Sequence, residues 1–199
     1  MKFLIGVDEA GRGPLAGPVG VGVVIAPKIF NIKKAFPGVA DSKVLSAKKR
    51  EEIYKLLQQA QREKTLRYIV VFASARVIDD IGITKAVRRA VYRGVRTLAP
   101  RNALGAPITI LLDGLLHAPP EYKQQTIIHG DATEPIISLA SIAAKVCRDA
   151  LMRTAAKKYP EYGFEVNKGY GTKKHYAALR RHGLCVIHRK SFCKNTRRR

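Results

Sequence analysis

The chain has 199 residues, with 37 lysines and arginines against 15 aspartates and glutamates, and a formal net charge of +22. This length predicts one domain, and the 46% hydrophobic share excludes a wholly disordered chain. The charge favours polyanionic partners such as nucleic acid, an anionic membrane or the ribosome. A membrane-spanning helix is not expected, because the longest uncharged stretch, residues 13–27, is broken by glycine and proline.

Two further features of composition indicate a compartment. The N-terminal apolar run is too short for a signal peptide and is closed by Asp8 and Glu9. Three cysteines, an odd number in a chain of this size, are typical of reduced thiols. We therefore expect a cytoplasmic protein without disulfides.

Alternating strand and helix patterns follow in chain order. Short β-branched segments bounded by glycine, proline or charge predict strands, at residues 3–7, 19–26, 66–73, 108–112 and 126–128. Helical spacing predicts helices, at residues 47–61 after a Ser46 cap, 84–98 and 135–156. This order predicts an α/β domain with a central sheet. Beyond Glu165 there is no acid, and the basic C-terminus is expected to be a mobile tail.

The third helix has two faces. Thr133 is placed to cap it, and Pro135 stands near its first position. Apolar residues at helical spacing are expected to face the core, namely Ile136, Ala140, Ala143, Ala144, Cys147 and Leu151. A polar stripe runs beside them through Ser138, Ser141, Lys145 and Arg148. That stripe either binds phosphates or is a solvated helix face.

Acids gather at the ends of predicted strands. Asp8 and Glu9 follow the first strand, Asp113 follows the fourth, and Asp131 follows the fifth. Strand ends at one sheet edge are where open α/β sheets build their sites, and carboxylate oxygens favour Mg²⁺ or Mn²⁺. The alternative is that each acid only closes a turn. Because consecutive strand residues point to opposite faces, Asp8 and Glu9 can share a metal only if the strand twists or ends between them, and we predict that it ends there.

A glycine loop follows the first acid pair, and its backbone can approach a ligand closely. It is the first of seven notable segments, which are residues 8–14 (DEAGRGP), 41–43 (DSK), 113–114 (DG), 130–131 (GD), 137–149 (ISLASIAAKVCRD), 168–172 (KGYGT) with His175, and 188–192 (HRKSF). Together these segments resemble the ribonuclease HII family, and they stand in that family's order over nearly the whole chain.

The resemblance implies an RNase H-like fold, in which a central mixed β-sheet is flanked by helices and followed by a C-terminal helical segment. Residues 1–199 would form one catalytic domain, with 160–192 as its C-terminal helical part and 193–199 as a basic tail. The implied activity is endonucleolytic cleavage of RNA in RNA–DNA hybrids and on the 5′ side of a lone ribonucleotide in duplex DNA. The products would carry a 3′-hydroxyl and a 5′-phosphate, and the role would be ribonucleotide removal from DNA by a monomer.

The resemblance also assigns residues. Asp8, Glu9, Asp113 and Asp131 match the family's metal-binding acids, which would hold two Mg²⁺ or Mn²⁺ ions. Asp149 competes with Asp131, although Lys145 and Arg153 four residues away favour a structural ion pair. The substrate contacts would be Gly11, Arg12 and Gly13 at the 2′-hydroxyl, Tyr170 on the next sugar, and Lys43, Ser141 and Lys145 at phosphates.

Two departures from the family stand out, Val44 in place of a second lysine and Gly82 in place of an asparagine. The first removes one phosphate contact, and the second puts the packing of its loop in doubt. No sliding-clamp motif is evident at the C-terminus. A zinc site is a weaker interpretation of the cluster His182, Cys185, His188 and Cys193, because the cysteines do not belong to the family pattern.

Two other classes of function remain open at this point. A non-catalytic nucleic-acid-binding protein would explain the charge, but it would leave four acids at strand ends unexplained. Another RNase H-like nuclease could use the same two-metal chemistry on DNA.

Overall fold

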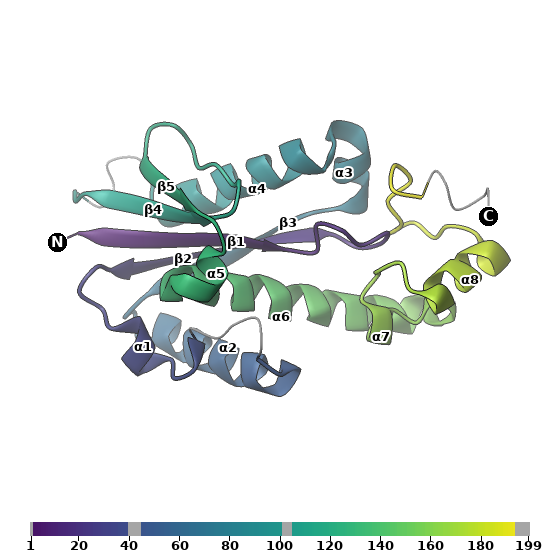
Figure 1. The fold of residues 1–199 in the computed structure, drawn as a ribbon, viewed down its shortest axis with the longest axis horizontal. Helices are drawn as coiled ribbons and strands as arrows, with labels where there is room; N and C mark the ends of the chain where they lie inside the picture. Colours follow the sequence, from purple (N-terminus) through teal and green to yellow (C-terminus); the bar gives the residue numbers. More distant parts are fainter. Residues whose placement is uncertain (1, 40–44, 101–104, 194–199) are drawn as a thin grey trace.

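The computed structural model describes residues 2–39, 45–100 and 105–193. Its centre is one five-stranded sheet with the order β3-β2-β1-β4-β5 (Figure 1). The strands are β1 (Phe3–Ala10), β2 (Val19–Pro27), β3 (Arg67–Ala73), β4 (Ile108–Asp113) and β5 (Lys123–Ile127). β1 pairs antiparallel with β2 and parallel with β4. The mixed sheet and all five predicted strands are confirmed, although β5 begins before the predicted segment.

Helices cover both faces of this sheet. They are α1 (Ile32–Ala35), α2 (Ala47–Arg62), α3 (Ala75–Ile81), α4 (Ile83–Leu98), α5 (Gly130–Thr133), α6 (Pro135–Lys158), α7 (Phe164–Asn167) and α8 (Lys173–His182), with a 3₁₀ turn at Pro160–Tyr162. The three predicted helices are confirmed, and Ser46 caps α2 by accepting the Lys49 N–H. The predicted cap of α6 is wrong: Thr133 ends α5, and Glu134 takes the cap position without a side-chain hydrogen bond.

Two apolar clusters form the core, one on each face of the sheet. On one face α3 and α4 pack on the sheet, and on the other α6 and α2 do (Figure 1). Strand residues alternate between the two clusters, since Ile5 and Val7 belong to the first and Leu4 packs against the second. The sheet is therefore buried on both faces, which explains the continuous apolar runs of β1 and β2.

Glycines let α6 lie unusually close to the sheet. A Cβ atom on Gly6 of β1 would lie 2.3 Å from the carbonyl oxygen of Ile136 in α6. A Cβ on Gly22 of β2 would lie 2.0 Å from the carbonyl oxygen of Ala140, one turn further on. No side chain fits at either position, so the glycines set the height of α6 above the strands.

The faces of α6 differ in part from the sequence prediction. Leu151 is 43% exposed, so its assignment to the core was wrong. Ser138 and Arg148, predicted to lie on a polar surface stripe, are fully buried. Ser138 is buried against α5, and Arg148 is buried against the loop before β2 and the loop before α8. Of the predicted stripe, only Ser141 and Lys145 keep partial exposure.

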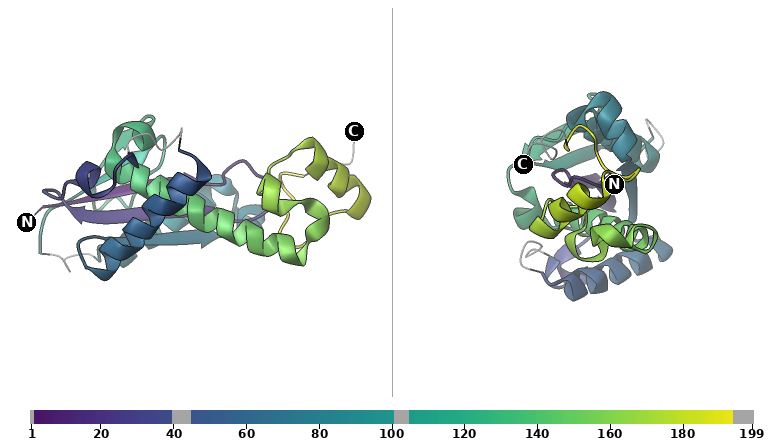
Figure 2. Two further views of the ribbon diagram at one scale, coloured as in Figure 1. Left: turned by 90° about the horizontal axis from the view of Figure 1, so that it is seen from below. Right: turned by 90° about the vertical axis from the view of Figure 1, so that its right-hand side faces the viewer.

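The C-terminal helices sit beyond one end of the sheet. α7 and α8 gather at the C-terminal end of α6 (Figure 2). A third apolar cluster joins them to the loop after β1 and to α6, through Leu15, Met152, Phe164 and Leu179. Cys193 is buried in this cluster, and the rest of the predicted tail, residues 194–199, lies outside the described residues. Within the described residues, none of the helices has the length and hydrophobicity of a membrane span, and Cys147, Cys185 and Cys193 form no disulfide.

Candidate active site

The first acid pair lies within β1 and not after it. The prediction that the strand ends between Asp8 and Glu9 was wrong, because β1 continues to Ala10 in register with β2. What stops is the pairing with β4, whose last partner on β1 is Val7. The two side chains therefore leave opposite faces of the strand, beside an edge that β4 no longer covers.

Asp8 faces α6 and is 6% exposed. Its pKa is raised to about 8, chiefly by burial and also by the charges of Glu9 and Asp113. Hydrogen bonds from the Ser141 hydroxyl and from the backbone N–H of Glu9, the latter at 2.7 Å, oppose this rise. Burial likewise raises the pKa of Glu9, against the attraction of Arg12. Three carboxyl groups thus lie close enough to disfavour one another's charge.

The other two acids meet at the C-terminal ends of β4 and β5. Asp113 is the last residue of β4, and its Oδ1 accepts the backbone N–H of Asp131 at 3.3 Å. Ser138 of α6 donates to the carbonyl oxygen of Asp131 and so fixes α5 against α6. In residues 2–39, 45–100 and 105–193, no three His, Cys, Asp or Glu side chains gather in a way that could hold a metal ion. The acids share one edge of the sheet without forming a finished ligand set.

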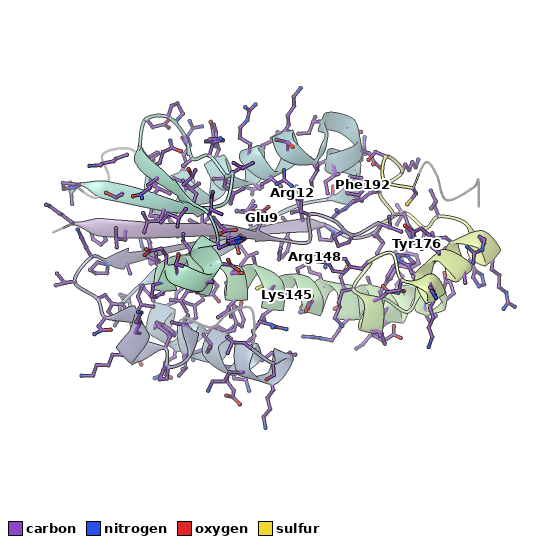
Figure 3. All side chains as sticks on the ribbon, in the orientation of Figure 1. Glu9, Arg12, Lys145, Arg148, Tyr176 and Phe192 are labelled. Atoms are coloured by element: carbon purple, nitrogen blue, oxygen red, sulfur yellow. The ribbon has the colours of Figure 1, made fainter. Side chains whose placement is uncertain are left out.

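A pocket of about 260 Å³ opens at this edge. Its lining combines residues predicted from several segments, namely Glu9, Gly11, Asp131, Ser141, Lys145 and Tyr170, with Ala10, Ile142 and Arg50. Figure 3 shows Glu9 and Arg12 together at the end of β1, and Lys145 and Arg148 along α6. Arg50, in the first turn of α2, was missed because nothing in its spacing distinguishes it from the other cations of that helix.

The glycine loop is shaped by its neighbours. Gly11 has φ +87°, and a Cβ there would lie 1.9 Å from Nε of Arg148, so this position requires glycine. The guanidinium of Arg12 donates to Glu9 at 3.2 Å and to the Thr84 hydroxyl at 3.3 Å. At Gly13 a Cβ would meet nothing within 4 Å, so the loop is open at that residue.

Two fully buried arginines hold this loop. Arg189 donates to the carbonyl oxygens of Gly17, Arg12 and Gly11 at 2.9, 2.8 and 2.7 Å. Arg148 donates to those of Pro18, Ala16 and Lys168 at 2.9, 3.2 and 3.0 Å.

Within the described residues neither guanidinium forms an ion pair. Burial lowers both pKa values, that of Arg189 to about 10. The sequence placed Arg148 on a surface stripe and gave Arg189 no role, because charged residues are rarely buried without a carboxylate partner.

The remaining predicted residues have mixed outcomes. Asp149 forms the predicted structural ion pair with Lys145 at 3.0 Å. Arg153, the other partner considered for Asp149, pairs with Glu51 instead. Gly82 joins α3 to α4 with φ +80°, a conformation that suits glycine. Lys43 and Val44 lie outside the described residues.

The zinc interpretation is not supported in the described chain. No group of His and Cys side chains there could hold a metal ion. Cys193 packs in the third apolar cluster, and the ring of His188 bonds to His175 and to the backbone of Cys185.

Comparison with known proteins identifies the family of this chain. The family model for ribonuclease HII matches residues 5–195. The ribonuclease HII of Endomicrobium trichonymphae is 46% identical over 189 residues, covering 94% of this chain and 83% of that protein. The ribonuclease HII of Coxiella burnetii is 45% identical over 196 residues, covering 96% of this chain and 88% of that protein.

Solved structures support the fold. The ribonuclease H2 of Pyrococcus horikoshii superposes with a TM-score of 0.76 at 24% identity, over 99% of this chain and all of that one. A Bst-RNase HIII in complex with Mn²⁺ gives a TM-score of 0.73 at 19% identity, over 99% of this chain and 71% of that one. With the family model covering nearly the whole chain, this protein belongs to the ribonuclease HII family and is an RNase H-type endoribonuclease that hydrolyses the RNA strand of RNA–DNA hybrids.

Proposed function

We propose that this enzyme also cuts duplex DNA on the 5′ side of a single embedded ribonucleotide, with divalent metal ions held by Asp8, Glu9, Asp113 and Asp131. The observation that carries the proposal is the shared pocket. Acids, a lysine, a hydroxyl, a glycine backbone and a tyrosine ring line one space, which suits a phosphodiester flanked by sugars. We place this activity in the cytoplasm and in ribonucleotide removal from DNA, with a monomer as the working form.

The donor set fits a hard divalent cation. All four side chains offer only oxygen, which suits Mg²⁺ or Mn²⁺. The mutual repulsion among Asp8, Glu9 and Asp113 is what a cation between them would relieve. Because Mg²⁺ usually keeps several waters, an incomplete protein shell is compatible with it. When bound, two such ions supply activation of a water and stabilisation of the departing 3′ oxygen.

The chain's own groups would place the substrate. Lys145, which forms an ion pair with Asp149, and the Ser141 hydroxyl would contact a phosphate beside the acids, and their presence in the pocket lining supports this. The backbone around Gly11 would read a ribose 2′-hydroxyl, and the ring of Tyr170, 44% exposed, lines the same pocket. The enzyme would then cut where the backbone around Gly11 meets a ribose and the ring of Tyr170 meets the deoxyribose of the next nucleotide.

The test is a cleavage assay on a labelled duplex with one ribonucleotide, with and without Mg²⁺ or Mn²⁺. We expect metal-dependent cleavage giving a 3′-hydroxyl and a 5′-phosphate, and no cleavage of the all-DNA duplex. An all-DNA duplex cut at the same rate would make the enzyme a general nuclease, and binding without metal-dependent cleavage would overturn the proposal. Asp113→Asn should remove turnover while the affinity for the duplex stays within about twofold.

A further inference from the structure

Two buried histidines lie behind the tyrosine of the pocket. His175 is in the first turn of α8, His188 is in the segment after α8, and both are fully enclosed. Their Nε2 atoms are 3.0 Å apart. The rings of Tyr162 and Phe164 surround the pair, with centroids 4.8 Å from His188 and 5.4 Å from His175 respectively. Neither histidine forms an ion pair within the described residues, so the pair is a hydrogen-bonded unit in an apolar setting.

The direction of each hydrogen bond follows from its partners. The Nδ1 of His175 lies 2.8 Å from the carbonyl oxygen of Tyr170, which can only accept, so this nitrogen carries the hydrogen. The Nε2 of neutral His175 must then accept, and the Nε2 of His188 must donate to it. This leaves the Nδ1 of His188 as an acceptor, and the backbone N–H of Cys185 donates to it at 2.9 Å. One arrangement of hydrogens satisfies all four ring nitrogens.

Both rings need to be neutral for this arrangement, and their surroundings favour that state. Burial lowers the pKa of His175, and burial with the neighbouring ring lowers that of His188 to about 4. If His188 were protonated, its Nδ1 would also carry a hydrogen. Two donors, this Nδ1–H and the backbone N–H of Cys185, would then face each other, and their hydrogen bond would be lost.

The loop that carries Tyr170, whose carbonyl oxygen accepts the hydrogen bond from His175, has two residues with positive φ. Lys168 and Gly169 both have positive φ, at 50° and 85°. Tyr170 follows them, its N–H donating to Asn167 at 2.9 Å and its carbonyl oxygen also accepting the N–H of Thr172 at 2.8 Å. The Nδ1–H of His175, which lies outside the loop, adds a third hydrogen bond to the backbone of Tyr170.

At the other end of these hydrogen bonds, the segment that carries His188 is attached to the glycine loop. His188 forms an isolated β-bridge with Ala16, and the backbone N–H of Arg189 donates to the Leu15 carbonyl oxygen at 2.8 Å. The histidine pair therefore links the loop that carries Gly11 to the loop that carries Tyr170. Gly11 and Tyr170, which these two loops carry, both line the pocket.

We propose that His175 and His188 are positioning residues, which fix Tyr170 relative to the glycine loop and thereby set the preference for an RNA-to-DNA junction over continuous RNA. The inference rests on the proposed role of Tyr170 in contacting the sugar. One hydrogen bond of this kind supports a change of about 3- to 10-fold in selectivity. Neither histidine lines the pocket, so the effect is transmitted through the peptide of Tyr170.

The experiment measures kcat/KM on a duplex with one ribonucleotide and on a continuous RNA–DNA hybrid. We expect His175→Leu to lower the ratio of the two values about 3- to 10-fold. His175→Asn, whose amide can donate from the place of Nδ1, should restore the ratio to within about twofold of the unmodified enzyme. His182→Leu, an exposed histidine of the same helix, is the matched control and should leave the ratio unchanged.

A second measurement does not depend on a variant that folds. Long-range ¹H–¹⁵N spectra of the unmodified enzyme should show His175 with its hydrogen on Nδ1 and His188 with its hydrogen on Nε2. A charged ring, or the opposite assignment, would overturn the inference. So would an unchanged ratio in folded His175→Leu when Tyr170→Ala lowers it. If Tyr170→Ala itself leaves the ratio unchanged, the role proposed for Tyr170 fails first.

Discussion

Replacing Asp8 by asparagine should stabilise the metal-free protein while removing its activity. The folded-state pKa of Asp8 is about 8, against 3.8 for the free side chain. The fold therefore holds a proton that the unfolded chain releases, so its stability is greatest below pH 3.8 and falls as the pH rises toward 8. At 1.36 kcal/mol for each pH unit, the cost reaches about 4 kcal/mol at pH 7. The asparagine amide has no proton to lose, and the variant's fold avoids that cost.

The assay is urea unfolding in EDTA at several pH values between 4 and 8. The stability difference between Asp8→Asn and the unmodified protein should grow by about 4 kcal/mol from pH 4 to pH 7. Asp80→Asn, a carboxyl that is 61% exposed beside Arg76, is the control and should change stability by less than about 0.5 kcal/mol. Mg²⁺ should stabilise only the unmodified protein. A difference that stays flat with pH would refute the reasoning, and so would near-normal turnover by the variant.

Three other changes test the scaffold. Gly22→Ala should destabilise the fold by about 3 kcal/mol or more in urea unfolding, since its Cβ meets the Ala140 carbonyl at 2.0 Å, whereas Gly13→Ala should fold normally. Arg189→Met should cost about 3 kcal/mol by the same measurement, because three carbonyl oxygens, two of them in buried hydrogen bonds, lose their donor, and a loss under about 1 kcal/mol would contradict this role. Between pH 6.5 and pH 4, His188 takes up a proton in the unfolded chain but stays neutral in the folded protein. Acidification over this range should therefore lower the free energy of unfolding by at most about 3 kcal/mol. His188→Gln should flatten that loss, and an equal slope in both proteins would exclude the histidine as its source.

The sequence predicted the sheet and its long helices well because their apolar periodicities are local. The resemblance to a known family also found six of the nine residues that line the pocket, Glu9, Gly11 and Tyr170 among them, because each lies in a short motif of that family. It failed at Asp8, where the strand continues past the predicted end. The end of pairing with β4 depends on a strand about a hundred positions later in the chain, which no local pattern of β1 can report.

Burial of charge was the other failure. Arg148 stands at a spacing that places it beside Lys145, and both are basic residues on one helix. Only the tertiary structure shows that the loop carbonyls replace water around Arg148 and leave Lys145 at the pocket. The pairing of His175 with His188 was hidden for the same reason, since it joins two segments through side chains alone.

The contact between Arg189 and Gly11 joins residues 178 positions apart in the sequence. During synthesis the acids of β1 emerge first, yet the loop beside them receives its donors only when the last part of the chain has been made. Because segments that depend on distant partners order late, the pocket should be among the last parts of the molecule to form. A nascent chain with a complete sheet but no C-terminal segment would then carry the catalytic acids without the means to place a nucleic acid against them.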